Sequence, residues 1–113
     1  MGYDLEQRTL TFALNVRDFC RKLKWDVINR VYIDQLIRSS SSIGANYSEA
    51  NENLGKADLK MRMKIARKEA KESTRWLTLL IVEETTLETE RIRLMAESEE
   101  LRKILSAIIN KLA

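Results

Sequence analysis

Proline is absent from the sequence and glycine occurs only three times, so few residues interrupt regular backbone structure. The composition is dominated by Leu, Glu, Lys, Arg and Ala, which favour helices. This combination argues against a β-sandwich or β-barrel and predicts an all-α protein. The 113 residues fit one domain, residues 1–113, with a single core.

Histidine is also absent, and cysteine occurs once, as Cys20. Because His and Cys are common metal ligands, an ordinary metal site would have almost no ligands, and we expect no metal or cofactor. One cysteine cannot form an internal disulfide, which indicates a reducing compartment. We expect Cys20 to be a small, buried, apolar residue.

Long hydrophobic runs are missing as well. The longest extends from Leu77 to Val82 and is interrupted by Thr78, whereas a membrane span needs about 18 residues. The N-terminus has no basic segment followed by an apolar one, which a signal peptide would have. We therefore expect a cytoplasmic protein that has no membrane partner.

Apolar residues instead recur at steps of three and four, which is the spacing of one helix face. Four helices are predicted, over about residues 4–24, 29–53, 58–84 and 86–112. Asp4, Asp58 and Thr85 are the expected N-terminal caps of the first, third and fourth helices. Asp26 and Asn29 are both possible caps of the second helix.

Four helices with one apolar face each need partners, and short connectors make neighbours antiparallel. The sequence therefore predicts an antiparallel up-down-up-down four-helix bundle with crossing angles of about 20°. More apolar residues are present than such a core needs, namely Ile33, Ile37, Ile65, Trp76, Leu79, Ile92, Met95, Ile104 and Ile109. We interpret this surplus partly as a widened core and partly as a subunit interface.

The stretch from Gln35 to Ala50 contains four consecutive serines and a glycine, a composition typical of a loop. Its spacing predicts a helix, because an apolar row and a polar row both repeat at steps of three and four. The apolar row is Leu36, Ser40, Ile43, Tyr47, Ala50 and Leu54, and the polar row is Ser39, Ser42, Asn46, Glu49 and Asn53. Small residues in this helix allow a neighbouring backbone to come close.

Charge is distributed unevenly along the chain, although the net charge is only +3. Residues 56–75 carry eight basic and three acidic side chains, which is a local charge of +5. Six of these cations recur at helical spacing and form a basic row: Lys56, Lys60, Lys64, Lys68, Lys71 and Arg75. A ridge of about 29 Å can follow the phosphate backbone of a nucleic acid. The alternatives are a solvated helix face, or pairing with the acidic region 83–100 of a neighbouring subunit.

Glu69 and Glu72 are three residues apart and share a helix face, as carboxylates do in di-iron helix bundles. Such sites also need Glu-x-x-His pairs, which a chain without histidine cannot supply. We therefore expect these carboxylates to accept hydrogen bonds across the contact between the second and third helices, from Arg38, Ser42 or Asn46. The full predicted polar network is Arg38, Ser42, Asn46, Glu49, Glu69 and Glu72.

Other side chains that could carry chemistry have structural interpretations too. Ser39 to Ser42 have no positioned base of the kind that a serine nucleophile requires, so we expect no catalytic residue and no enzyme activity. Trp25 and Trp76 could stack on nucleic-acid bases. Trp76 lies beside the core row of its helix, which favours packing or an interface, whereas the role of Trp25 stays open.

Two segments together resemble one family, residues 35–50 (QLIRSSSSIGANYSEA) and residues 64–80 (KIARKEAKESTRWLTLL). They are similar to the bacterial four-helix-bundle proteins encoded by intervening sequences of 23S ribosomal RNA genes. That family itself resembles the accessory variability determinant of diversity-generating retroelements. The residues that carry the similarity are Arg38, Ser42, Asn46, Glu49, Glu69, Glu72, Trp76 and Leu77. The chain departs from the pattern at Lys56-Ala57-Asp58, where the family more often has a serine before the aspartate.

The resemblance implies a ring-forming homo-oligomer, with a pentamer as the expected form, and no established catalytic activity. In the retroelement branch the ring is expected to bind a reverse transcriptase and nucleic acid through a basic surface. In the ribosomal branch the location of the gene suggests that the protein binds RNA. We therefore predict a non-enzymatic scaffold that binds RNA, or an RNA-associated protein, through its basic row. The alternatives are a purely protein-binding or structural oligomer and an accessory subunit of a reverse transcriptase.

Overall fold

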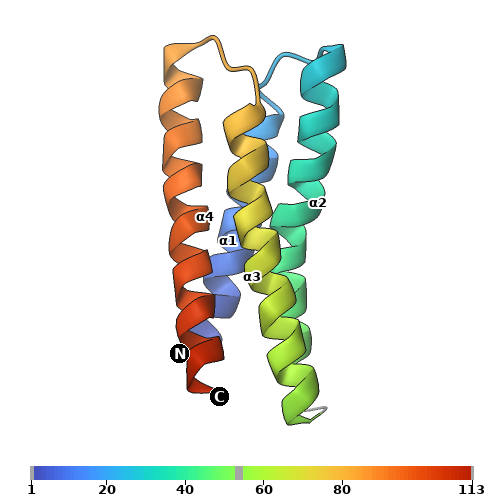
Figure 1. Cartoon of the computed structure of the whole chain (residues 1–113). Helices are drawn as coiled ribbons and strands as arrows, with labels where there is room; N and C mark the ends of the chain where they lie inside the picture. The colour runs from blue at the N-terminus through green and yellow to red at the C-terminus, as the bar shows by residue number, and fades with distance from the viewer. Residues whose placement is uncertain (1, 53–54, 113) are drawn as a thin grey trace.

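Four long helices make up the computed structural model of the chain (Figure 1), which describes residues 2–52 and 55–112 and the side chains from Leu5 onward. They are α1 (Gly2–Cys20), α2 (Val27–Ala50), α3 (Lys56–Leu79) and α4 (Thr85–Lys111). Neither of the two described ranges contains a strand, so the all-α prediction is confirmed.

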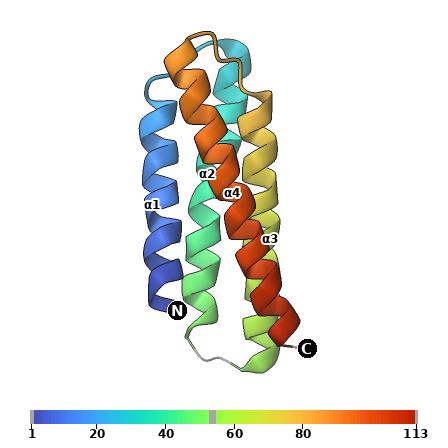
Figure 2. The ribbon, with the colours of Figure 1, turned by 90° about the vertical axis from the view of Figure 1, so that its left-hand side faces the viewer.

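The helices stand side by side along the long axis of a molecule that measures 45 × 22 × 19 Å (Figure 1 and Figure 2). The connectors α1–α2 and α3–α4 lie at one end of the molecule. The end of α2, the start of α3, the start of α1 and the end of α4 lie at the other. The most extensive packing is between α2 and α3, and the least extensive is between α1 and α4. As a result, α3 contacts α2 along one side and α4 along the other.

The apolar rows expected from the spacing form the core. In the row that begins on α1 with Leu5, the buried members are Leu5, Thr9, Phe12, Val16, Phe19 and Leu23. In the row on α2 they are Leu36, Ser40, Ile43, Tyr47 and Ala50. The serine-rich stretch is therefore helical, as its spacing predicted. Ser40 is tolerated in the core because its hydroxyl donates to the carbonyl of Ile37, at 3.3 Å. Asn53 and Leu54, which end the two predicted rows, lie outside the described residues.

A glycine allows α1 and α2 to approach closely. A Cβ atom added at Gly44 would lie 2.8 Å from Oγ1 and 3.2 Å from Cβ of Thr9. The Thr9 side chain is buried and its hydroxyl donates to the carbonyl of Glu6, so it has little room to move away. The prediction that small residues in this stretch permit close approach is confirmed at Gly44.

The N-cap of α2 is one of the two residues that the sequence left open. Asp26 is the N-cap, and its carboxylate accepts from the backbone N–H groups of Ile28 (3.0 Å) and Asn29 (2.8 Å). Asn29 has another role: its buried amide donates to the carbonyl of Ile81 and accepts from the N–H of Ile81, both at 2.9 Å. These bonds hold the α3–α4 connector outside a helix, which is why α3 ends at Leu79 rather than at residue 84.

The other three predicted caps are wrong. Asp4 lies inside α1, which begins at Gly2. Asp58 lies in the first turn of α3 and pairs with Arg62 at 3.7 Å, whereas the N-cap is Gly55, with a φ of +116°. Thr85 is the first residue of α4 and makes no side-chain cap bond. Each helix starts one or two residues before the predicted position. At α3 the reason is that an acidic side chain such as Asp58 also favours the first turn itself.

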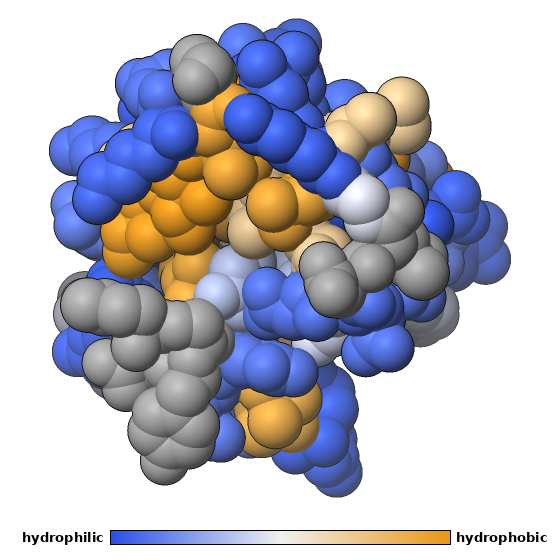
Figure 3. Space-filling model, turned by 90° about the horizontal axis from the view of Figure 1, so that it is seen from below, coloured by the Kyte–Doolittle hydropathy of each residue, from blue (hydrophilic) through white to orange (hydrophobic). Residues whose placement is uncertain are grey.

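The surplus of apolar side chains divides between core and surface. Ile33 and Ile109 are buried, so these two belong to the core. The larger exposed apolar side chains are Leu10, Leu14, Trp25, Val27, Ile28, Val31, Ile37, Met61, Leu79, Ile81 and Ile92. Seen from the end at which α4 finishes, apolar surface also gathers on one side of the molecule (Figure 3). The predicted subunit interface therefore has apolar surface available to it.

Cys20 is a buried residue near the end of α1, as predicted. Its burial raises the pKa of the thiol to about 12, so the reactive thiolate is scarce at neutral pH. None of the described helices combines the length and the apolar character that crossing a membrane requires.

Candidate nucleic-acid interface

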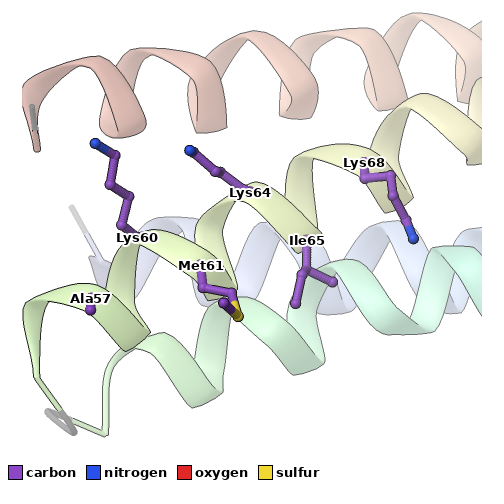
Figure 4. A pocket seen from close by; sticks show the side chains of 6 residues that line it. All are labelled: Ala57, Lys60, Met61, Lys64, Ile65 and Lys68. Carbon is purple, nitrogen blue, oxygen red and sulfur yellow. The ribbon is translucent and has the colours of Figure 1, made fainter.

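The basic row lies along the side of α3 that faces away from the core. Lys56, Lys64, Lys68, Lys71 and Arg75 are exposed and Lys60 is half-buried. A pocket of about 470 Å³ lies in the first half of this surface. Figure 4 shows that Lys60 and Lys64 extend from α3 toward α4, whereas Met61 and Ile65 point toward α2. The row is therefore flanked by apolar side chains on its α2 side.

The cations of the basic row form no ion pairs within the part of the chain that the structure describes. Among the described residues, none of the six lies within 4.0 Å of a carboxylate oxygen. The glutamates of α4 pair with other residues instead: Glu97 with Arg8, Glu90 with Lys22, Glu88 with Arg91, Glu99 with Arg102, and Glu100 with Lys103. The acidic region that was the alternative partner of the row is thus largely neutralised within its own chain.

A groove of about 610 Å³ runs between α3 and α4, next to the basic row. Its lining residues are Lys64, Arg67, Lys68 and Lys71 from α3 and Glu99, Arg102 and Ser106 from α4; we call them the α3–α4 groove. The row supplies three of the five cations, and Arg67 and Arg102 were not predicted. The spacing within one helix could not find them, because α4 forms the other wall.

The two arginines of the groove are held by α4 in different ways. Arg102 donates to Oε1 of Glu99 from Nε (3.1 Å) and Nη2 (2.9 Å), and Thr74 donates to Oε2 of Glu99 at 3.2 Å. The bonds from Arg102 and Thr74 lower the pKa of Glu99, so this carboxylate is ionised at neutral pH. Arg67 donates from Nη1 to the hydroxyl of Ser106 at 3.4 Å, and no carboxylate of the described side chains lies within 4.0 Å of it.

Comparison with known proteins identifies the family. Residues 3–107 match the family described as 23S rRNA-intervening sequence protein. The chain belongs to this family. A similar solved structure is that of a protein of unknown function from the S23 ribosomal protein family of Bacteroides thetaiotaomicron VPI-5482, with a TM-score of 0.78 and 30% sequence identity over 96% of this chain and 97% of that chain. No curated protein matches the chain.

The resemblance read from residues 35–50 and 64–80 is therefore confirmed as membership of the 23S rRNA-intervening sequence protein family. The further similarity to the retroelement accessory determinant stays a prediction. The family match covers all four helices except the first residue of α1 and the last residues of α4.

The polar network predicted from the family residues is not formed as expected. Within the described part of the chain, the carboxylates of Glu69 and Glu72 accept no hydrogen bond from Arg38, Ser42 or Asn46. Glu69, Glu72, Ser42 and Asn46 are half-buried, and Arg38 and Glu49 are exposed, so these side chains lie along the outer edge of the α2–α3 contact. Water can satisfy polar groups there, which removes the requirement for bonds between them.

Other residues make the polar contacts between α2 and α3. The buried hydroxyls of Ser39 and Ser73 are 2.8 Å apart, and Arg62 donates to Oδ1 of Asn46 at 3.3 Å. Partial burial, and then the charge of Glu72, raise the pKa of Glu69. This shift has the opposite direction from that of a carboxylate held by hydrogen-bond donors.

The two tryptophans lie away from the α3–α4 groove. The ring of Trp76 stacks on that of Tyr32 from α2, with centroids 6.3 Å apart and an interplanar angle of 24°, so its predicted packing role is confirmed. Trp25 lies between α1 and α2 and its side chain is 67% exposed. Neither ring is among the residues that line the groove.

No cluster of three or more potential metal-binding side chains occurs among residues 2–52 and 55–112. The hydroxyls of the serine-rich stretch are used inside α2: Ser39 donates to the carbonyl of Leu36, and Ser41 to that of Ile37. The exposed cations of the basic row on α3 can bind an anionic ligand electrostatically.

Proposed function

We propose that this member of the 23S rRNA-intervening sequence protein family is a non-enzymatic cytoplasmic scaffold that binds RNA, or an RNA-associated protein, through the basic row of α3. The protomer is an antiparallel up-down-up-down bundle, and we infer that it assembles into a ring, with a pentamer as the expected form. The observation that supports binding is that the six cations of the row have no carboxylate partner among the described residues.

An unpaired row of cations favours a polyanion for a physical reason. Each cation that neutralises a phosphate releases a condensed counterion, and this entropy gain drives binding. Had the row been paired with α4, the same positive charges would have been neutralised by glutamates before any ligand arrived. A ring would carry one copy of the row on each subunit, and the copies would raise the overall affinity by multivalency.

The proposal of a ring is supported by the apolar surface. Val27 is 72% exposed, Val31 is 54% exposed and Ile92 is 57% exposed. Side chains of this kind lose their contact with water when a second copy covers them, which favours association. Light scattering after gel filtration measures the mass directly, and a monomer at micromolar concentration would contradict the ring.

The RNA-binding proposal is tested by fluorescence anisotropy with labelled RNA between 50 and 200 mM salt. With six phosphate contacts, we expect a plot of log K against log salt to have a slope of about −4 to −5. A slope near zero would show that the row is not used.

The same apolar surface favours a second candidate, a protein-binding or structural oligomer, which includes an accessory subunit of a reverse transcriptase. In that case the protein would form its oligomer but would bind RNA no better than an uncharged protein of the same size. Anisotropy and light scattering on one preparation distinguish these outcomes, because they report ligand binding and assembly separately.

A further inference from the structure

We propose that the α3–α4 groove is a binding site for the backbone of double-stranded RNA, in which Arg67 holds one phosphate in a fixed position. This inference depends on the proposed RNA-binding function and specifies its site and its ligand class. It involves the second wall of the groove, which α4 provides, and two arginines outside the basic row.

The charge of the groove suits a phosphate backbone. Five of its seven lining residues are cationic and one, Glu99, is anionic. Glu99 accepts two hydrogen bonds from Arg102 and one from Thr74 of α3, so its negative charge is already compensated by Arg102. The remaining positive charge lies on Lys64, Arg67, Lys68 and Lys71, which together follow about two turns of α3.

Arg67 differs from the lysines beside it in its burial and in its contact with the opposite helix. Its side chain is half-buried, and the bond from Nη1 to Ser106 Oγ (3.4 Å) ties it to the opposite helix. A guanidinium has five N–H donors in a planar fork, so one bond to Ser106 leaves donors for a phosphate. Because these contacts restrict the side chain, we expect binding to cost less conformational entropy than it does for an exposed lysine.

Arg62 lies on the same helix as Arg67, but its guanidinium is used in contacts within the protein. It lies 3.7 Å from the carboxylate of Asp58 and donates to Asn46 at 3.3 Å. Arg67 has no carboxylate within 4.0 Å among the described residues. Arg62 is therefore a matched control: like Arg67 it is half-buried, but its charge is already compensated by Asp58.

The absence of aromatic side chains from the groove lining indicates a duplex rather than a single strand. Sites for single strands combine cations with aromatic rings on which unpaired bases stack. The seven lining residues include no aromatic ring. A-form duplexes keep their bases inside and are recognised by shape through phosphates and 2′-hydroxyls, which cations and hydroxyl groups can contact.

The ligand class is tested with two RNAs that carry about the same number of phosphates: a duplex of about 16 base pairs and an unstructured strand of about 32 nucleotides. We expect the duplex to bind at least about fivefold more tightly, and duplexes of different sequence to agree within about twofold. If the strand binds as tightly as the duplex, or more tightly, the duplex proposal fails while RNA binding stands. If neither binds at 50 mM salt, the proposed function itself fails.

The role of Arg67 is tested with Arg67→Lys, which keeps the charge and loses the fork. We expect duplex affinity to fall about fivefold with the salt slope unchanged, whereas Arg62→Lys changes it less than about twofold. Ser106→Ala, which releases the guanidinium, should cost about twofold to threefold. Thermal melting identifies any variant that loses its fold.

A different pattern would overturn the assignment of Arg67. If Arg67→Lys binds the duplex like the unchanged protein, and Arg67→Gln reduces only the salt slope, then Arg67 contributes charge alone. An equal loss for Arg62→Lys and Arg67→Lys would also refute a fixed phosphate position at Arg67.

Discussion

Helices α3 and α4 lie side by side and are both rich in charged residues, but they use their charges differently. On α4 the glutamates form ion pairs within the chain: Glu97 with α1, Glu90 with Lys22 of the α1–α2 connector, and Glu88, Glu99 and Glu100 with α4 itself. On α3 the six cations of the basic row have no such partner among the described residues. Both helices carry many charges, but the cations of the basic row are left unpaired within the described part of the chain and so are available to a ligand. The difference lies in the ion pairs, not in the number of charges.

Reversing charge on α3 should have the largest effect. The triple variant Lys60→Glu, Lys64→Glu, Lys68→Glu removes three cations from the row and adds three repulsive charges. We expect RNA affinity at 50 mM salt to fall at least about a hundredfold, measured by anisotropy. Stability should change little, because exposed substitutions usually alter the free energy of unfolding by about 0.5 kcal/mol or less each.

A matched control reverses the same amount of charge elsewhere. Arg21, Lys24 and Arg30 are exposed near the α1–α2 connector and belong to none of the ion pairs among the described residues. Changing these three to Glu should reduce RNA affinity much less than the α3 variant does. Equal losses would mean that net charge alone governs binding, and the distinction between the two regions would disappear. If the α3 variant instead breaks the oligomer, the protein-binding candidate gains support.

Releasing Arg102 on the α4 wall from its carboxylate partner should strengthen RNA binding, by a smaller factor than the loss expected for the α3 variant. Glu99→Gln removes the one carboxylate of the α3–α4 groove and leaves Arg102 without its charged partner. We expect duplex affinity to rise about threefold at 50 mM salt. An unchanged affinity would indicate that the α4 wall does not touch the RNA.

The same substitution has a pH signature in urea unfolding. The folded-state pKa of Glu99 is lowered, chiefly by its bond to Arg102. Its contribution to stability is therefore present above the unfolded-state pKa and is lost as the pH falls through the folded-state pKa. For so exposed a pair we expect Glu99→Gln to cost less than about 1 kcal/mol at pH 7, with the difference vanishing in acid.

Glu69 should respond to pH in the opposite direction. Burial, and then Glu72, raise its pKa, so its ionised form is less favourable in the folded chain than in the unfolded one. The resulting penalty is present at neutral pH and disappears as the pH falls below the unfolded-state pKa. We expect Glu69→Gln to stabilise the protein at pH 7 by about 0.5 kcal/mol or less. A loss of stability would instead support the predicted hydrogen-bonded network.

The smallest effect is expected at the ion pair between α1 and α4. Arg8 and Glu97 lie 2.7 Å apart, but their side chains are 42% and 31% exposed. Removing the pair through Glu97→Gln should lower the free energy of unfolding by about 0.5 kcal/mol. RNA affinity should stay within about twofold, since the pair lies on the far side of α4 from the groove.

The helix faces could be predicted from the sequence because periodicity acts within one helix. The row Leu36, Ser40, Ile43 and Tyr47 is buried where the spacing places it, despite a composition typical of a loop. Helix starts were less predictable: Asp58 and Thr85 have the residue types of caps, yet they lie in first turns. An acidic or hydroxyl side chain suits either position, so residue type alone does not decide between them.

Features that join two helices could not be predicted in the same way. Arg67 becomes part of a groove only because Ser106 and Arg102 lie opposite it on α4, and nothing in the spacing of α3 indicates that register. The predicted network at Glu69 and Glu72 assumed that their face is turned inward. They are only half-buried, and the buried hydroxyls of Ser39 and Ser73 make the contact between α2 and α3 instead.

The hydrogen bonds of the Asn29 amide have a consequence for how the chain unfolds. One side chain at the start of α2 satisfies both backbone groups of Ile81, a residue 52 positions later in the chain. Leucine would fill similar space there but would leave the N–H and the carbonyl of Ile81 without this partner. These two hydrogen bonds join the α1–α2 hairpin to the α3–α4 hairpin at the end of the molecule where both connectors lie. We therefore expect the two hairpins to unfold together.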